Sequence, residues 1–427
     1  MCEVMTWLVD SRDPTRFPYD AVLYEYQKVG KQFVSLELLG VLGQVRAGLP
    51  PPGSSPDLRR LRSFLDVALD KADDRYDYRT YIAVDLLPIR CDPAVQAAAA
   101  LRDRDRVVAR LIADMLRFEL AAADRRTDLL PQMRPDEQLA SKRFRLAVRA
   151  ARAALQRLRL ADEITLDGPV AAARLVWAAV DADLSVDERL DLRLSMMPVY
   201  LVHDEYMFIR VLQAFEVTFA LLAVDLSAAV TALGGGHAEA AAQRLDAATT
   251  VLGETAPLFS LMATMQVLSF HAFRQHTEGA SAIQSRPYKM VEALCRRPDP
   301  DRLHSAAYRC VPEVRDLVLA GQPNLSQTYG AVGDALSAAE RVRLDQAMSG
   351  FAAALLRWRQ THYRLAVRML GDRRGTGATD GTAYLRSTRA IAVFHEQPTA
   401  GRPNGGTTRR HRAAHHASAG CLISEGR

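Results

Sequence analysis

Apolar residues recur every three or four positions along most of the chain, whereas the alternation typical of β-strands is nearly absent. This period places apolar side chains on one face of a helix. One such face consists of Phe208, Leu212, Phe215, Phe219 and Leu222. Another, near the C-terminus, consists of Leu344, Met348, Phe351, Leu355, Trp358, His362, Leu365 and Met369. The pattern therefore predicts an all-α fold.

Helix-breaking residues divide the predicted helices into groups. Breaks or loops are expected at 48–56 (GLPPPGSSP), 130–137 (LPQMRPDE), 233–240 (LGGGHAEA) and 295–304 (CRRPDPDRLH). The arginine-rich helices between residues 100 and 160 are expected to expose solvated faces, with a partner-binding surface as the alternative. From about residue 401 the apolar period is lost, so we expect a disordered tail over 396–427.

Composition narrows the class of protein. The chain has 427 residues, of which 49% are hydrophobic and 25% charged, as in a globular protein with a sizeable core. Much of the net charge of +5 comes from arginines near the C-terminus, so no nucleic-acid surface is expected. The N-terminus lacks the apolar core of a signal peptide, and no uninterrupted apolar stretch reaches about 18 residues. We expect a cytoplasmic protein without a membrane span.

The five cysteines are scattered and form neither CxxC nor CxxCH. The usual zinc motifs and c-type haem attachment therefore have no support, and reduced thiols are expected.

One residue on the last apolar face suggests chemistry. His362 faces the predicted interior, and Trp358 precedes it by one helical turn. A histidine in such a position is commonly a hydrogen-bonded core residue, but a buried neutral imidazole also binds haem iron. Periodicity alone does not distinguish the two interpretations.

Four separated stretches carry a family resemblance. They are DYRTYIAVDLL (77–87), HDEYMFIRVLQAFE (203–216), FHAFRQHTEGASAIQSRPYKMVE (270–292) and WRQTHYRLAVRMLGDRRGTGATDGTAYLR (358–386). In this order they resemble the motifs TYxxYLxLxxLL, HDExxFIxxHQxxE, FRxxLxxxSGFQSxQxRxxE and WRxxHxxxVxRxxGxxxGTGGSxGxxYLR. These motifs are typical of the tryptophan 2,3-dioxygenase superfamily, the haem-dependent aromatic amino acid oxygenases.

The resemblance implies a helical bundle that encloses a b-type haem, and a role for each matching residue. His362 matches the ligand of the haem iron and Trp358 its neighbour in the haem pocket. Arg274 matches the arginine that binds the substrate carboxylate, and Thr376 a threonine that contacts the substrate's ammonium and carboxylate groups. The other pocket positions are Phe208, Leu212, Phe270, Ser281, Tyr78, Ile82, Gly375 and Gly377.

Taken without the resemblance, several of these residues have simpler interpretations. Arg274 reads as an arginine that binds the last carbonyls of its helix, Thr376 as a polar loop residue, and Phe208 and Phe270 as core.

Three departures from the family pattern affect the expected function. Leu212 occupies the place of the family's distal histidine, and Ala282 replaces the glycine of SGFQS. Residues 93–200 form a long helical insertion, and the helix that the family carries after YLR is missing. The expected organisation is an N-terminal helical extension (1–75), a haem-binding catalytic domain (76–395) that contains the insertion, and the tail.

The implied function is oxygenation of an aromatic amino acid with haem iron as cofactor and O₂ as co-substrate. The leading candidate is insertion of O₂ into the indole ring of tryptophan or a derivative, giving N-formylkynurenine as in the kynurenine pathway. The alternative is a haem-dependent hydroxylase of a tyrosine or tryptophan derivative in specialised metabolism, and a second alternative is a non-catalytic haem-binding protein. A homo-oligomer, tetramer or dimer, is expected, in which the segment around Tyr78 completes a neighbouring subunit's pocket.

Overall fold

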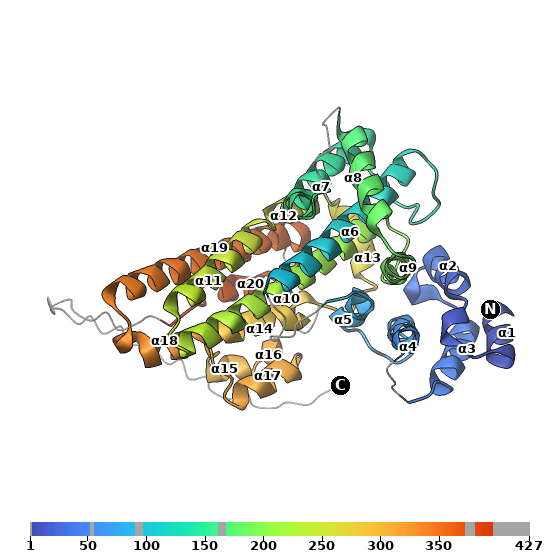
Figure 1. Cartoon of the computed structure of the whole chain (residues 1–427). Helices are drawn as coiled ribbons and strands as arrows, with labels where there is room; N and C mark the ends of the chain where they lie inside the picture. The colour runs from blue at the N-terminus through green and yellow to red at the C-terminus, as the bar shows by residue number, and fades with distance from the viewer. Residues whose placement is uncertain (1, 52–54, 90–96, 161–167, 372–380, 396–427) are drawn as a thin grey trace, which may run out of the picture. The chain divides into compact units, whose positions relative to one another are not determined.

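The computed structural model of the chain describes residues 2–51, 55–89, 97–160, 168–371 and 381–395. Within these residues one isolated β-bridge, between Gln132 and Val202, is the only extended pairing, and the rest is helix and loop. The predicted all-α fold is confirmed (Figure 1). The predicted disordered tail lies outside the described residues.

The first helices form a core of their own. They are α1 (Cys2–Asp10), α2 (Tyr19–Val29), α3 (Leu36–Ala47) and α4 (Pro56–Ala68), with the 3₁₀ turns η1 (Pro14–Arg16) and η2 (Lys31–Phe33). Their apolar faces enclose a cluster that includes Trp7, Phe17, Tyr26 and Phe64. The break expected at 48–56 is confirmed, because α3 ends at Ala47 and α4 begins at Pro56.

The next segment carries the predicted helical insertion. After α5 (Tyr78–Tyr81) and η3 (Val84–Leu86) come α6 (Ala97–Ala123), α7 (Glu137–Arg157), α8 (Pro169–Asp183) and α9 (Val186–Leu194). The break at 130–137 separates α6 from α7, as predicted, and these two helices pack against each other.

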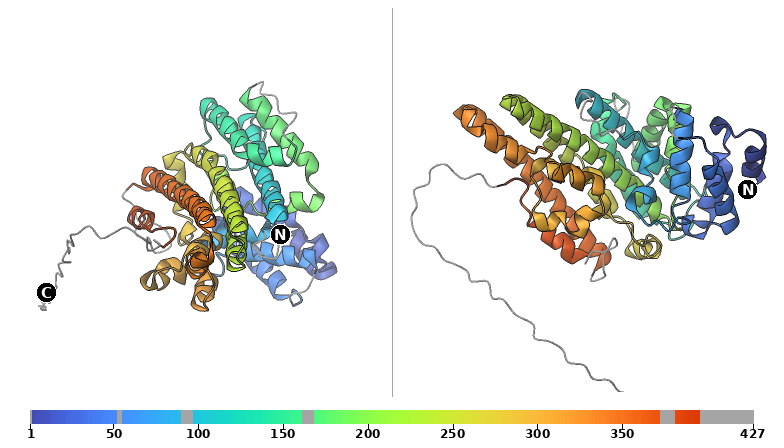
Figure 2. Two further views of the ribbon diagram at one scale, coloured as in Figure 1. Left: turned by 60° about the vertical axis from the view of Figure 1, so that its left-hand side comes forward. Right: turned by 90° about the horizontal axis from the view of Figure 1, so that it is seen from below.

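The main core surrounds one long helix, α10 (Asp204–Gly234). Gly236 adopts a φ of 79° just after it, which lets the chain reverse into α11 (Ala238–Gly253). The third long helix, α19 (Ala338–Leu370), begins at a capping box of Ser337 and Glu340. α10 packs on α6 and α11, and α11 packs on α19, so the four helices lie side by side (Figures 1 and 2).

Shorter helices connect α11 to α19 and follow α19. They are α12 (Ala256–Met262), α13 (Val267–Arg274), η4 (Ala282–Gln284), α14 (Arg286–Cys295), α15 (Pro300–Leu303), α16 (Ala306–Arg309), α17 (Pro312–Leu319), α18 (Leu325–Val332), η5 (Gly333–Ala335) and α20 (Thr382–Arg389). The break predicted at 233–240 is confirmed. The loop predicted at 295–304 contains the one-turn helix α15, which Pro300 initiates at its first position.

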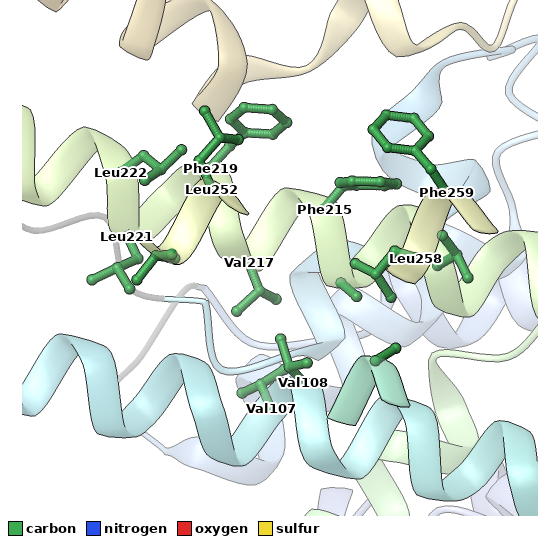
Figure 3. Close-up of a cluster of buried hydrophobic side chains, with 14 of the residues drawn as sticks. Val107, Val108, Phe215, Val217, Phe219, Leu221, Leu222, Leu252, Leu258 and Phe259 are labelled. Atoms are coloured by element: carbon green, nitrogen blue, oxygen red, sulfur yellow. The ribbon is translucent and has the colours of Figure 1, made fainter. Parts of the chain in front are cut away.

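α10 is buried on opposite faces. Figure 3 shows Val217 pointing towards Val107 and Val108 of α6, whereas Phe219 points to the other side. Among the described helices α10 is long and apolar enough, by length and composition, to cross a membrane, although Arg210, Glu216 and Asp225 interrupt its apolar residues. The segments Ala238–Met262 and Val267–Arg274, which are bent by 95° at the break between them, are long and apolar enough only if they are counted together as one span. Of the most apolar window of α10, 67% is buried against the rest of the protein, as in a core helix.

A buried ionic network joins the insertion to the start of α10. Arg143 of α7 donates to Glu119 of α6 at 3.0 Å and to Asp204 of α10 at 2.6 Å. His203 Nε2 lies 3.1 Å from Glu119 Oε2, and the four side chains are almost fully excluded from solvent. The HDE sequence at 203–205 therefore anchors the insertion rather than the cavity described below.

We predict that Arg143→Met destabilises the protein by about 3–5 kcal/mol, because two buried carboxylates lose their cation. Arg149→Ala, on an exposed face of the same helix, is the control and is expected to change stability by about 0.5 kcal/mol or less. Urea unfolding followed by circular dichroism measures both. Equal stabilities of the two variants would show that the network contributes nothing.

Candidate functional site

A cavity lies between α10, α13, α14, α19 and α20, and the atom-free space in and in front of it, open solvent included, is about 1390 Å³. Because α10 and α19 both contribute aromatic side chains to its wall, the cavity is mostly apolar. A cavity of this kind with few polar groups is typical of a small-molecule or cofactor site.

Aromatic rings form one wall. Trp358 of α19 lies with its ring centroid 5.7 Å from Phe215, 5.0 Å from Phe219 and 5.4 Å from Phe259. Figure 3 shows the three phenylalanines on α10 and α12. Trp358 Nε1 is buried and has no hydrogen-bond partner among the described residues. An unpaired buried N–H costs free energy, so this wall is suited to a ligand that accepts a hydrogen bond.

His362 follows Trp358 by one turn and lines the same cavity, which confirms that it faces the interior. Its ring centroid is 5.3 Å from that of Trp358 and 6.5 Å from that of Phe259. Burial lowers the pKa of His362 to about 4, so the imidazole is neutral at pH 7. No described residue forms a hydrogen bond with its ring. A neutral imidazole on an apolar wall is the form that binds a metal.

The wall on α13 brings the predicted substrate residues together. Phe270 and Arg274 line the cavity with Phe208 of α10, whose ring centroid lies 6.0 Å from that of Phe270. A guanidinium beside two aromatic rings is suited to a ligand that has a carboxylate and an aromatic group.

A buried carboxyl group is the only acidic side chain among the described residues that line the cavity. Glu216 is 5% exposed, and burial raises its pKa to about 7 although hydroxyl groups of Ser285 and Tyr78 hydrogen-bond to it. The backbone N–H groups of Tyr78 and Ser281 both donate to Gln284 Oε1, at 2.8 and 3.2 Å. These contacts fasten the segment around Tyr78 to the loop 281–285.

Tyr78 lines the cavity of its own chain, as its place among the predicted pocket residues implies. The contribution of its segment to a neighbouring subunit's pocket stays a prediction.

Cationic side chains gather at another part of the wall. Lys289, Arg302 and Arg359 all line the cavity, and all three form ion pairs with Glu292, at 3.0, 2.9 and 3.2 Å. Burial alone would raise the pKa of Glu292, but the three cations hold it well below its usual range. The carboxylate is therefore ionised, and it neutralises one of three positive charges.

Two predicted pocket residues lie beside the cavity instead of lining it. Leu212 and Ile82 belong to a neighbouring apolar cluster with Tyr81 and Ile209. The helical period places Leu212 on the same side of α10 as Phe208 and Phe219, so the contacts between helices, and not the spacing along α10, decide that Leu212 packs against the neighbouring cluster. Ser281, Trp358, Phe208 and Phe270 do line it. Thr376, Gly375 and Gly377 lie outside the described residues.

Several cavity residues were missed by the sequence reasoning. Glu216 ends the stretch HDEYMFIRVLQAFE and Arg359 follows Trp358, so both stood inside recognised motifs. Lys289 and Glu292, spaced i,i+3 on one helix, could also have been noticed. Arg302 gave no signal, because it lies in a segment that was expected to be a loop.

Together, the helical core and the aromatic cavity with its neutral histidine define an all-α protein with a buried ligand site. The family model for tryptophan 2,3-dioxygenase matches residues 187–312. A tryptophan 2,3-dioxygenase of Anaeromyxobacter dehalogenans is 30% identical over 45% of this chain and 84% of its own length. That of Anaeromyxobacter sp. is 29% identical over 49% of this chain and 90% of its own length, and that of Caulobacter vibrioides is 25% identical over 50% and 93%. The chain belongs to the tryptophan 2,3-dioxygenase family, which places it among the oxidoreductases.

We predict that Glu216→Gln gains stability relative to the wild type as pH rises. The folded protein raises the pKa of Glu216 from 4.5 to about 7, so it binds more protons than the unfolded chain and its stability falls over this range. Glutamine cannot ionise, so the difference should grow from about pH 4.5, level off above pH 7 and reach about 3 kcal/mol at most.

Urea unfolding at pH 5, 6, 7 and 8 measures this difference. Glu137→Gln, at an exposed position, is the control and should change stability by about 0.5 kcal/mol or less. A pH-independent difference for Glu216→Gln would contradict the prediction.

Proposed function

We propose that this protein is a haem-dependent oxygenase of an aromatic amino acid, with tryptophan or a derivative as the leading substrate. The observation that carries the proposal is the pair of groups in one apolar cavity: the neutral imidazole of His362 and the guanidinium of Arg274. The names of the relatives support tryptophan as the substrate. The expected cytoplasmic location is part of the same proposal.

The residues of the cavity fit a haem. His362 offers a neutral nitrogen with no described partner, the rings of Phe215, Phe219 and Phe259 offer an apolar wall, and the unpaired N–H of Trp358 offers a donor. In this proposal His362 holds the iron. Haem, when bound, supplies the oxidative chemistry with O₂ as co-substrate.

The protein's own residues bind and orient the substrate. Arg274 binds the carboxylate through two parallel hydrogen bonds, and Phe208 and Phe270 pack on the aromatic ring. The apolar walls exclude water, which strengthens the ionic contact with Arg274. Thr376 remains part of the proposal as a contact of the substrate's ammonium and carboxylate groups.

The alternative reaction is hydroxylation of a tyrosine or tryptophan derivative, and one observation favours it. Among the described cavity residues His362 is the only histidine, and Leu212 stands in the family's distal position. An indole N–H in this cavity therefore has no second imidazole as acceptor. An unpaired donor there costs about 1–3 kcal/mol, which would weaken binding of plain tryptophan.

The two reactions are separated by one assay. The haem-loaded protein is given L-tryptophan or L-tyrosine with O₂ and a reductant, or with peroxide, and products are identified by mass spectrometry. N-formylkynurenine, a gain of two oxygen atoms, supports the dioxygenase. A gain of one oxygen atom supports the hydroxylase, and no product with either oxidant contradicts both.

His362→Ala is expected to abolish the stoichiometric complex with ferric haem, because the variant has no iron ligand. Haem titration followed at the Soret band measures this. His237→Ala, at an exposed position before α11, is the control and should bind haem like the wild type. Full haem occupancy in His362→Ala would remove this residue as the ligand.

Arg274→Ala is expected to weaken binding of L-tryptophan by about tenfold to hundredfold, since charge-assisted hydrogen bonds are lost. Haem content should remain unchanged. Tryptamine, which lacks the carboxylate, is the matched ligand: the wild type should prefer L-tryptophan, and the variant should bind both alike. A preference retained by the variant would mean that Arg274 does not contact the carboxylate.

A further inference from the structure

The three cations on the cavity wall outnumber the acids around them. Within the described part of the chain Lys289, Arg302 and Arg359 have Glu292 as their only ion-pair partner. Glu292 is ionised, so the group carries a net charge of about +2. Lys289, Glu292 and Arg359 are 2, 7 and 5% exposed, so water screens this charge poorly. Uncompensated buried charge is costly, and a bound anion would relieve it.

The hydrogen bonds show which cations remain available. All three nitrogens of the Arg359 guanidinium have partners: Nε donates to the Tyr288 hydroxyl, Nη1 to the Ile391 carbonyl and Nη2 to Glu292. Arg359 therefore positions Glu292 and, unlike Arg302, has a described partner at every nitrogen of its guanidinium.

Lys289 and Arg302 each have N–H groups without a described hydrogen-bond partner. Lys289 Nζ has three N–H groups, and the one hydrogen bond described for it goes to Glu292. Both hydrogen bonds described for Arg302 leave from Nη2, at 2.9 Å to each oxygen of Glu292. The Nε and Nη1 groups of Arg302 have no partner in the described structure, and both side chains line the cavity.

We propose that Lys289 and Arg302 form a dianion site for the two propionate groups of the porphyrin. Two cations with spare donors match two carboxylates in number and charge, and the site shares its cavity with His362. This inference rests on the proposed function, because it requires the cavity to hold haem. The inference names the two residues, Lys289 and Arg302, that would make the cavity prefer a porphyrin with free carboxylates.

The test compares two ligands of the full-length apoprotein, ferric haem and its dimethyl ester, in the same buffer, by titration at the Soret band. The ester has the same ring and iron but no charge on its side arms. The wild type should bind haem about tenfold to hundredfold more tightly than the ester. This preference should shrink as the salt concentration rises.

Variants then assign the preference to residues. Lys289→Met and Arg302→Gln should each lose about tenfold or more in affinity for haem and keep their affinity for the ester. Arg302→Lys should restore part of the preference. Arg296→Gln is the matched control, because Arg296 pairs with Asp299 nearby and does not line the cavity.

The outcomes separate this inference from the proposed function. If the wild type binds haem and the ester equally well, the dianion site is wrong and the proposed function stands. If it binds neither, both fail. If the variants bind haem normally but lose affinity for L-tryptophan, the cluster binds the substrate's carboxylate and the inference is overturned. Should the variants fail to fold, the wild-type comparison of acid and ester decides by itself.

Discussion

The burial of α10 is the constraint on which the rest of the structure depends. This helix packs on α6 along one side and on α11 along another, while Phe208, Phe215, Glu216 and Phe219 face the cavity. A helix so placed has few solvent-exposed positions, and each of its polar side chains needs a partner inside the protein. Arg210 donates a hydrogen bond to the Asp114 carboxylate. The carboxylate of Glu205 accepts hydrogen bonds from the backbone N–H groups of Val199 and Tyr200. The motif residues around the cavity are thus held by packing as much as by their own chemistry.

Charge is distributed unevenly around the cavity. At His362 burial removes the positive charge, so the aromatic wall is neutral. At Glu292 burial is outweighed by three cations, and that part of the wall is positive. Burial raises the pKa of Glu216, because its hydroxyl partners offset only part of the loss of water and no described cation pairs with it. One apolar cavity therefore offers a neutral nitrogen, an anion-binding cluster and a carboxyl group that ionises near neutrality, and these are the groups that a haem and an amino acid would require between them.

Helices α6 to α9, which lie in the region predicted to be an insertion, contact both α10 and the cluster of the first helices. Of these, α6 and α7 reach α10 through the network of Glu119, Arg143 and Asp204, and Leu194 at the end of α9 packs into the N-terminal cluster. Between these contacts lies the segment of α5, held to loop 281–285 through Gln284. The helices on both sides of this segment in the chain thus support the position of Tyr78 at the cavity.

The sequence by itself determined the fold class and much of the candidate site. The period of apolar residues gave the helices, the breakers at 48–56 and 130–137 gave their ends, and four short motifs placed His362, Arg274, Phe208 and Phe270 together. Helix period and breakers are local properties of the chain, and the motifs match a known family directly, so a single sequence was enough to predict them. The tertiary structure alone decided that Leu212 packs beside the cavity and that Arg302 joins Lys289. Each of these depends on which elements meet in space, and residue spacing along a helix carries no information about a partner more than a turn or two away.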